Sequence, residues 1–192
     1  MVVNQSDVIT RPIKPFFIGK AVVASLWKSG FMGDTFVRGR RQFEKYKSSF
    51  MGDLAKLALK EWLEEQGFEV IDYDDVRSSW RSSRKPYDLQ VNNHNIEVKS
   101  SVAQRPNLQW ILQNEHIIHP CNVTVKEITV QTFFKDASCE MVWLCGWALR
   151  SDLEQPRYRQ PRRVPGGRLT DFYLMPFSDP NAKPMNDLLS YL

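Results

Sequence analysis

The clearest periodic signal in the chain lies between residues 53 and 66. Apolar side chains recur there at spacings of three and four residues, on one side of a helix: Leu54, Ala55, Ala58, Leu59, Trp62 and Leu63. Asp53 can cap the start of this helix by accepting a backbone N–H. Gly67 stands where a left-handed residue often ends a helix. The pattern predicts a helix over residues 53–66 whose apolar stripe covers another element.

Alternation of apolar and polar residues, or enrichment in β-branched and aromatic residues, predicts the strands. These are residues 68–73, 87–91, 96–100, 123–134 and 141–149. The NNHN sequence after residue 91 predicts a hairpin turn centred on Asn93 and His94, because asparagine tolerates a positive φ. Residues 107–118 fit either a strand or a short helix. We therefore expect an α/β fold with a mixed sheet flanked by helices, and with the helix 53–66 on one face of that sheet.

The two ends of the chain carry weaker signals. Residues 1–20 have no clear period and predict an extended arm, while residues 154–168, with three prolines and five arginines, predict a loop. The tail from residue 171 is expected to pack on the core and to end in a short helix over residues 186–192. We divide the chain into an N-terminal arm with a helical extension (1–50), a core (51–150), and a basic loop with a C-terminal tail (151–192).

Composition narrows the class of protein. The chain has 192 residues, of which 42% are hydrophobic and 25% are charged, and this excludes a disordered or collagen-like protein. Its three cysteines are too few for a disulfide framework and favour a reducing compartment. No apolar run reaches about 18 residues, and the first residues lack the pattern of a secretory signal. We expect a cytoplasmic protein that does not enter a membrane.

A zinc site is one alternative for the histidines and cysteines. His116, His119 and Cys121 lie close together in the sequence, but structural zinc sites favour tight C-x₂₋₄-C pairs, and Cys139 and Cys145 are more widely spaced. Cys145 also falls in an apolar strand. The cysteines are better interpreted as small buried hydrophobic residues.

The predicted hairpin carries the candidate chemistry. Because side chains alternate across a strand, the hairpin has an apolar face and a polar face. The apolar face holds Leu89, Val91, Ile96 and Val98, and the polar face holds Asp88, Gln90, Glu97 and Lys99. With the turn placed as above, Asp88 and Glu97 are diagonal neighbours, with Cβ atoms about 7 Å apart. Two such carboxylates can bridge one hard cation, and Lys99 beside them can orient or deprotonate a metal-bound water. The same polar face also fits an ordinary solvated sheet.

The elements around this hairpin resemble the PD-(D/E)xK nuclease superfamily, which includes many restriction endonucleases. The resembling stretch runs from about Gly52 to Ser101. It contains a helix, a glycine, a strand, a basic loop, the sequence Pro86-Tyr87-Asp88, and the sequence Ile96-Glu97-Val98-Lys99. The resemblance implies a restriction-endonuclease-like core over residues 51–150, Mg²⁺ or Mn²⁺ as the cofactor, and hydrolysis of DNA phosphodiester bonds.

The resemblance also implies roles for single residues. Asp88 and Glu97 match the two metal-binding carboxylates, the backbone carbonyl of Val98 matches a further ligand, and Lys99 matches the catalytic lysine. Many members carry another acid on the preceding helix. Lys56 stands there in this chain, and we expect Asp53, one turn earlier, to serve instead. This departure keeps two alternatives open: a nucleic-acid-binding domain that has lost catalysis, or a structural subunit with an incidental polar hairpin.

Basic side chains gather in two segments that contain no acidic residue, residues 77–85 and 157–168. Such clusters are typical of surfaces that contact phosphates. We expect contacts with DNA from Arg77, Arg81, Arg84, Lys85, Arg162 and Arg163. An enzyme that cuts both strands of DNA would act as a homodimer with two sites, a state that the resemblance implies.

Overall fold

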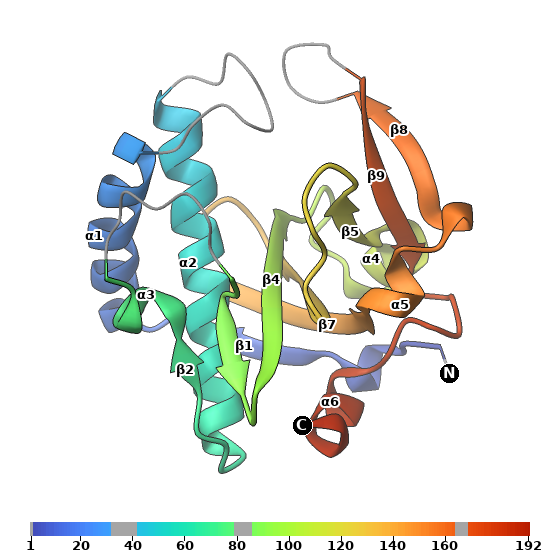
Figure 1. Cartoon of the computed structure of the whole chain (residues 1–192), viewed down its shortest axis with the longest axis horizontal. Helices are drawn as coiled ribbons and strands as arrows, with labels where there is room; N and C mark the ends of the chain where they lie inside the picture. The colour runs from blue at the N-terminus through green and yellow to red at the C-terminus, as the bar shows by residue number, and fades with distance from the viewer. Residues whose placement is uncertain (1, 32–41, 79–85, 164–168) are drawn as a thin grey trace.

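The computed structural model describes residues 2–31, 42–78, 86–163 and 169–192 (Figure 1). The strands are β1 (Ile9–Pro12), β2 (Ile71–Asp72), β3 (Leu89–Val91), β4 (His94–Val102), β5 (His116–Pro120), β6 (Ile128–Phe134), β7 (Met141–Leu149), β8 (Arg159–Arg163) and β9 (Leu169–Pro176). The helices are η1 (Gln5–Asp7), α1 (Pro15–Phe31), α2 (Gln42–Glu65), α3 (Tyr73–Val76), α4 (Leu108–Asn114), α5 (Arg150–Leu153), η2 (Pro156–Tyr158) and α6 (Met185–Tyr191).

These strands form a mixed six-stranded sheet and a smaller antiparallel sheet. The order in the large sheet is β1-β7-β6-β4-β3-β2, and the order in the small sheet is β5-β9-β8. In the large sheet β4 and β6 are parallel, with Ile96 beside Ile128, and the other neighbours are antiparallel. The α/β class with a mixed sheet flanked by helices is therefore confirmed.

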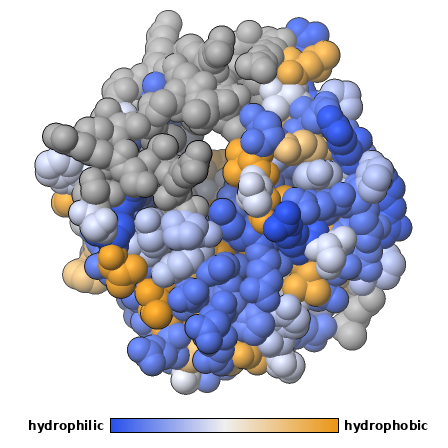
Figure 2. Space-filling view, viewed as in Figure 1, coloured by the Kyte–Doolittle hydropathy of each residue, from blue (hydrophilic) through white to orange (hydrophobic). Residues whose placement is uncertain are grey.

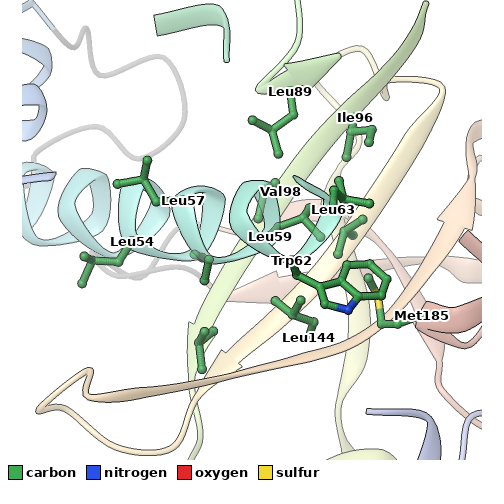
Figure 3. Close-up of a cluster of buried hydrophobic side chains, with 14 of the residues drawn as sticks. Leu54, Leu57, Leu59, Trp62, Leu63, Leu89, Ile96, Val98, Leu144 and Met185 are labelled. Carbon is green, nitrogen blue, oxygen red and sulfur yellow. The ribbon is translucent and has the colours of Figure 1, made fainter. Parts of the chain in front are cut away.

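Helix α2 covers one face of the large sheet. Its apolar side packs against the hairpin side chains Leu89, Ile96 and Val98, and all of these belong to one buried cluster (Figure 3). Helix α1 packs on α2 and forms an outer layer at the edge of the molecule (Figure 1). The predicted burial of the apolar hairpin face under this helix is confirmed. The other face of the large sheet carries a second buried cluster. This cluster includes Phe133 of the large sheet and Ile117 and Met175 of the small sheet, and so it joins the two sheets.

The central strands β6 and β7 are buried on both faces, because each face of the sheet is covered. All seven residues of β6 are buried, and β7 has the predicted limits, 141–149. A strand covered on both sides is apolar on both sides, which explains why β7 shows no alternation of polar residues.

Helix α2 starts at Gln42, so the predicted start at residue 53 is wrong. Asp53 lies inside the helix and is buried, where it accepts a hydrogen bond from Ser25 of α1. In the sequence alone, an acidic residue that bonds to a neighbouring helix cannot be distinguished from a helix cap. The predicted end is confirmed, since Gly67 has a φ of +90°.

The strand after this helix is shorter than predicted and lies at the edge of the sheet, not in its centre. Only Ile71 and Asp72 pair with β3. The side chain of Asp72 then accepts a hydrogen bond from the backbone N–H of Asp74 and caps α3, which ends the strand.

Three other segments differ from the expectations. Residues 1–20 are not one extended arm, because β1 occupies 9–12 and α1 begins at Pro15, a residue suited to the first turn of a helix. Residues 107–118 contain both alternatives in succession, α4 and then β5. Residues 159–163 form an edge strand and not a loop; an edge strand tolerates Pro161, whose missing N–H costs no ladder bond there. Within the described residues, no helix is long and apolar enough to cross a membrane.

Candidate functional site

The β3–β4 hairpin turns at Asn92 and Asn93, which have φ values of 47° and 69°. Both central residues of a type I′ turn need a positive φ, and asparagine accepts it. Leu89 therefore pairs with Ile96, and the predicted turn at Asn93 and His94 is wrong by one position. The resulting register is shifted by two residues from the expected one, and the paired strand begins at Leu89, directly after Asp88. The backbone N–H of Asp88 donates to the carbonyl of Ile96.

Glu97 is the most constrained side chain on the polar face. Only 15% of its side chain is exposed, and both carboxylate oxygens are bound. Lys99 Nζ lies 2.5 Å from Oε1, and His119 Nε2 lies 2.8 Å from Oε2. Burial by itself would raise the pKa of Glu97, but the hydrogen bond from His119 and the charge of Lys99 outweigh it and lower this pKa to about 2. Glu97 is therefore an ionised carboxylate at neutral pH.

His119 belongs to this site and was not predicted as part of it. It is fully buried on β5, and its Nδ1 lies 3.0 Å from the carbonyl oxygen of Pro120. A carbonyl and a carboxylate both accept hydrogen bonds, so each ring nitrogen of His119 lies beside an acceptor. Its partner Glu97 is 22 residues away in the sequence. The only signal in the sequence that could have indicated it was a pair of histidines, His116 and His119, around the apolar residues 117–118.

Asp88 contacts the strand that carries Glu97 and Val98. The backbone N–H of Val98 donates to Asp88 Oδ2 at 2.8 Å. The N–H and C=O of one strand residue point to the same neighbour, so the carbonyl of Val98 faces the Asp88 side as well. On the other neighbour of β4, Thr129 pairs with Glu97 in the sheet, and its buried hydroxyl has no hydrogen-bond partner among the described residues.

These oxygen ligands suit Mg²⁺ or Mn²⁺, which also takes ligands from water and substrate, better than they suit a metal that protein side chains alone must hold. Asp88 and Glu97 supply carboxylate oxygens and Val98 supplies a carbonyl, the hard ligands that Mg²⁺ takes together with waters and substrate phosphates. Across the described residues, no group of three or more His, Cys, Asp or Glu side chains is arranged to hold a metal ion. Any metal here would therefore depend on two carboxylates and on ligands from solvent or substrate.

The structure does not bring Asp53 to this site, which corrects the expectation that Asp53 replaces the usual helix acid. Asp53 accepts hydrogen bonds from Ser25 and from Lys28 of α1, and only 6% of its side chain is exposed. Lys56 stands in the same cluster, with Nζ 2.6 Å from Asp72 and 2.5 Å from Asp74. This buried cluster joins α1, α2 and α3. Helix α2 covers the apolar face of the hairpin, whereas Glu97 and Lys99 lie on the opposite face.

The predicted phosphate contacts fall into three groups. Arg77 is only 6% exposed, because it pairs with Asp74 and lies over the ring of Tyr73, and this leaves little of it for a phosphate. Arg81, Arg84 and Lys85 lie outside the described residues. Arg162 and Arg163 lie on β8, where hydrophilic side chains cover the edge of the molecule (Figure 2). As neighbours in a strand they point to opposite faces of the β8–β9 ribbon.

His116 and the cysteines form no second metal site among the described residues. Burial, and then the charge of Arg162, lowers the pKa of His116. Cys139 and Cys145 are buried thiols, as the sequence analysis predicts, and burial raises the pKa of both. Cys121 is only half-buried, which differs from that prediction.

Comparisons of the chain with protein-family models, with curated proteins and with solved structures found no match. The functional argument therefore depends on the geometry of the hairpin.

Proposed function

We propose that this chain is a metal-dependent DNA endonuclease of the PD-(D/E)xK type, with Asp88, Glu97 and Lys99 as its catalytic residues. The observation that supports this most is the register of the hairpin. It places Glu97 and Lys99 together on the polar face and brings the backbone N–H of Val98 to the carboxylate of Asp88, while the apolar face is buried under α2. A two-carboxylate site beside a lysine suits phosphodiester hydrolysis.

In this proposal each residue of the site has a separate role. Asp88, Glu97 and the carbonyl of Val98 would hold the divalent cation, which when bound would activate a water and offset negative charge on the phosphate. Lys99 keeps 25% of its side chain exposed, and it would orient that water or the phosphate. His119 holds the buried oxygen of Glu97 in place.

The order of elements supports the same proposal. In chain order, helix α2 is followed by a three-stranded antiparallel unit (β2, β3 and β4, with the short α3 after β2) and by helix α4. Strand β6, parallel to β4, comes next after β5 of the small sheet. This is the arrangement that we expect of a restriction-endonuclease-like core. We propose DNA as the substrate because the β8 arginines supply positive charge, and the cytoplasm as the compartment because the three cysteines are free thiols.

A catalytically inactive nucleic-acid-binding domain is the second candidate. One observation favours it: the helix position where many superfamily members carry an acid holds Lys56, which is paired with Asp72 and Asp74. A site limited to two carboxylates holds a metal weakly, and a protein that only binds DNA needs none.

Incubation with supercoiled and linear DNA separates the two candidates. The protein is assayed with Mg²⁺, with Mn²⁺ and with EDTA, and binding is measured in parallel by fluorescence anisotropy. Cutting that EDTA abolishes supports the endonuclease, whereas binding without cutting in any metal supports the inactive domain.

The variants Asp88→Asn, Glu97→Gln and Lys99→Ala test the assignment of residues. Each is expected to slow cutting by on the order of 100-fold or more, equal to about 3 kcal/mol of transition-state stabilisation. Glu64→Gln, which removes a charge from an exposed position on α2, is the matched control and should cut at the wild-type rate. Wild-type cutting by Glu97→Gln in Mg²⁺ would refute the proposal.

A further inference from the structure

Helix α1 exposes apolar side chains on the side that faces away from the rest of the protein. Phe16 is 75% exposed, Val23 58%, Leu26 60% and Trp27 57%. The opposite side of the helix, with Phe17, Ala21 and Ser25, is buried against α2. A solvated helix face is normally polar, so this face lacks the covering that its composition requires.

The exposed face continues into a groove between α1, α2 and α3. The groove has a volume of about 570 Å³, and its walls include Phe16, Val23, Trp27 and Leu57. Its rim carries the ion pair between Lys20 and Asp75, whose atoms lie 2.9 Å apart. An acidic rim and an apolar wall disfavour nucleic acid as the occupant, because a phosphate would meet carboxylates and find few cations.

The sequence of α1 is self-complementary when two copies run antiparallel. A twofold axis between residues 21 and 22 places Phe16 against Trp27 of the other copy, and sets Gly19 beside Ala24. Large aromatic residues then lie at both ends and small residues lie near the middle. A twofold interface needs this property, since the same patch must serve both partners.

The exposed area is sufficient for such a pair. The four exposed side chains leave on the order of 500 Å² of apolar surface per copy, given full areas of about 150–250 Å² for large side chains. With these side chains fully covered, two copies would bury on the order of 1,000 Å², the lower limit for a biological interface. Lys20 is already paired with Asp75 in each copy, so like charges do not oppose the contact.

We infer that this chain forms a homodimer through the exposed face of α1, with the two α1 helices antiparallel. The inference names the surface of a homodimer and stands whether or not the hairpin cuts DNA. The homodimer would still form if the hairpin were inactive, because none of the α1 residues in the proposed interface belongs to the polar face of the hairpin.

Sedimentation equilibrium of the full chain between about 1 and 100 µM tests the inference. We expect a mass that approaches twice the 22.4 kDa of the monomer. Val23→Glu and Gly19→Glu should weaken dimerisation at least tenfold, with unchanged far-UV circular dichroism. At Gly19 an added Cβ would meet nothing within 4 Å, so that variant introduces no clash within one copy.

Val123→Glu is the matched control, because Val123 is a 40% exposed valine outside α1. It should dimerise like the wild type. The antiparallel arrangement is tested by oxidising a mixture of Phe16→Cys and Trp27→Cys proteins, which should form a disulfide between the two variants that the wild type does not form. A wild-type monomer at 100 µM, or a dimer that survives both Val23→Glu and Gly19→Glu, would overturn the inference.

Discussion

Replacing Lys56 with methionine should destabilise the protein strongly. The Lys56 side chain is only 5% exposed, and its ammonium lies 2.6 Å from Asp72 and 2.5 Å from Asp74. Methionine keeps the length and apolar character of the stem but removes the charge. The side chain of Asp72 is fully buried, and its Oδ2 has no hydrogen-bond partner among the described residues. The loss of Lys56 would therefore leave a buried carboxylate without its cation.

The structure also sets the size of this effect. Removing one partner of a buried ion pair costs about 3–5 kcal/mol, because the other charge remains buried. Asp74 keeps Lys28 and Arg77 as partners, so the lower end of that range applies. For a domain of this length, about 3 kcal/mol corresponds to a melting temperature lower by about 6–12 °C.

Chemical denaturation at pH 7, followed by tryptophan fluorescence, measures the change in free energy of unfolding. Lys60→Met is the matched control on the same helix, because Lys60 is more exposed and its ammonium lies 3.4 Å from Asp75. Such a pair contributes at most about 1 kcal/mol. A loss below about 1 kcal/mol for Lys56→Met would show that the cluster does not depend on Lys56.

Lys56→Glu extends the same test to the functional question. It installs the kind of acid that many members of the superfamily carry, but next to the three carboxylates of Asp53, Asp72 and Asp74. We expect it to destabilise the protein more than Lys56→Met does, and not to raise nuclease activity. A stable and more active Lys56→Glu protein would contradict the placement of this cluster on the α2 side of the hairpin, opposite Glu97 and Lys99.

Three further predictions concern the hairpin and the basic ribbon. In EDTA, the free energy of unfolding of the wild type should fall by about 3 kcal/mol more than that of Glu97→Gln between pH 6 and pH 2. The lowered pKa of Glu97 stabilises the fold fully above about pH 4.5, and this contribution is lost as the pH falls towards 2. Parallel curves for the two proteins, from denaturation measured at each pH, would contradict this prediction. His119→Gln retains an N–H donor for Glu97 and His119→Leu does not, so DNA cutting should be at least tenfold slower in the leucine variant, and equal rates in the two variants would exclude a role for the donor. Replacing Arg162 and Arg163 with alanine should lower the slope of log affinity against log salt by about one to two units, and an unchanged slope would show that β8 does not contact phosphates.

The parts of the fold that were predictable are those in which local periodicity and tertiary burial agree. Strand β7 was predicted with its correct limits because nine successive residues carry few polar groups. The apolar side of α2 and the two faces of the hairpin followed from periods of about 3.6 and two residues. In each case the buried side chains lie close together in the sequence, so no knowledge of distant contacts was needed.

The errors arise where a distant partner decides the role of a residue. Asp53 has the sequence context of a cap, but Ser25 and Lys28 of another helix hold it inside α2. His119 joins the candidate site because the β5 strand of the small sheet packs beside β4. Asp72 ends its strand by capping α3. Sequence periodicity carries no information about such contacts, so neither the buried charge cluster nor the histidine could be placed from it.

The hairpin shows why an error in register left the predicted apolar face intact. The predicted turn at Asn93 and His94 lies one position beyond the observed turn at Asn92 and Asn93, and moving a turn by one position changes the pairing by two residues. Because side chains alternate with a period of two, a two-residue change keeps every side chain on its own face, whereas a one-residue change would exchange the faces. Burial of the apolar face under α2 therefore fixes which residues share the polar face, and the turn residues fix only which residues of β3 and β4 pair.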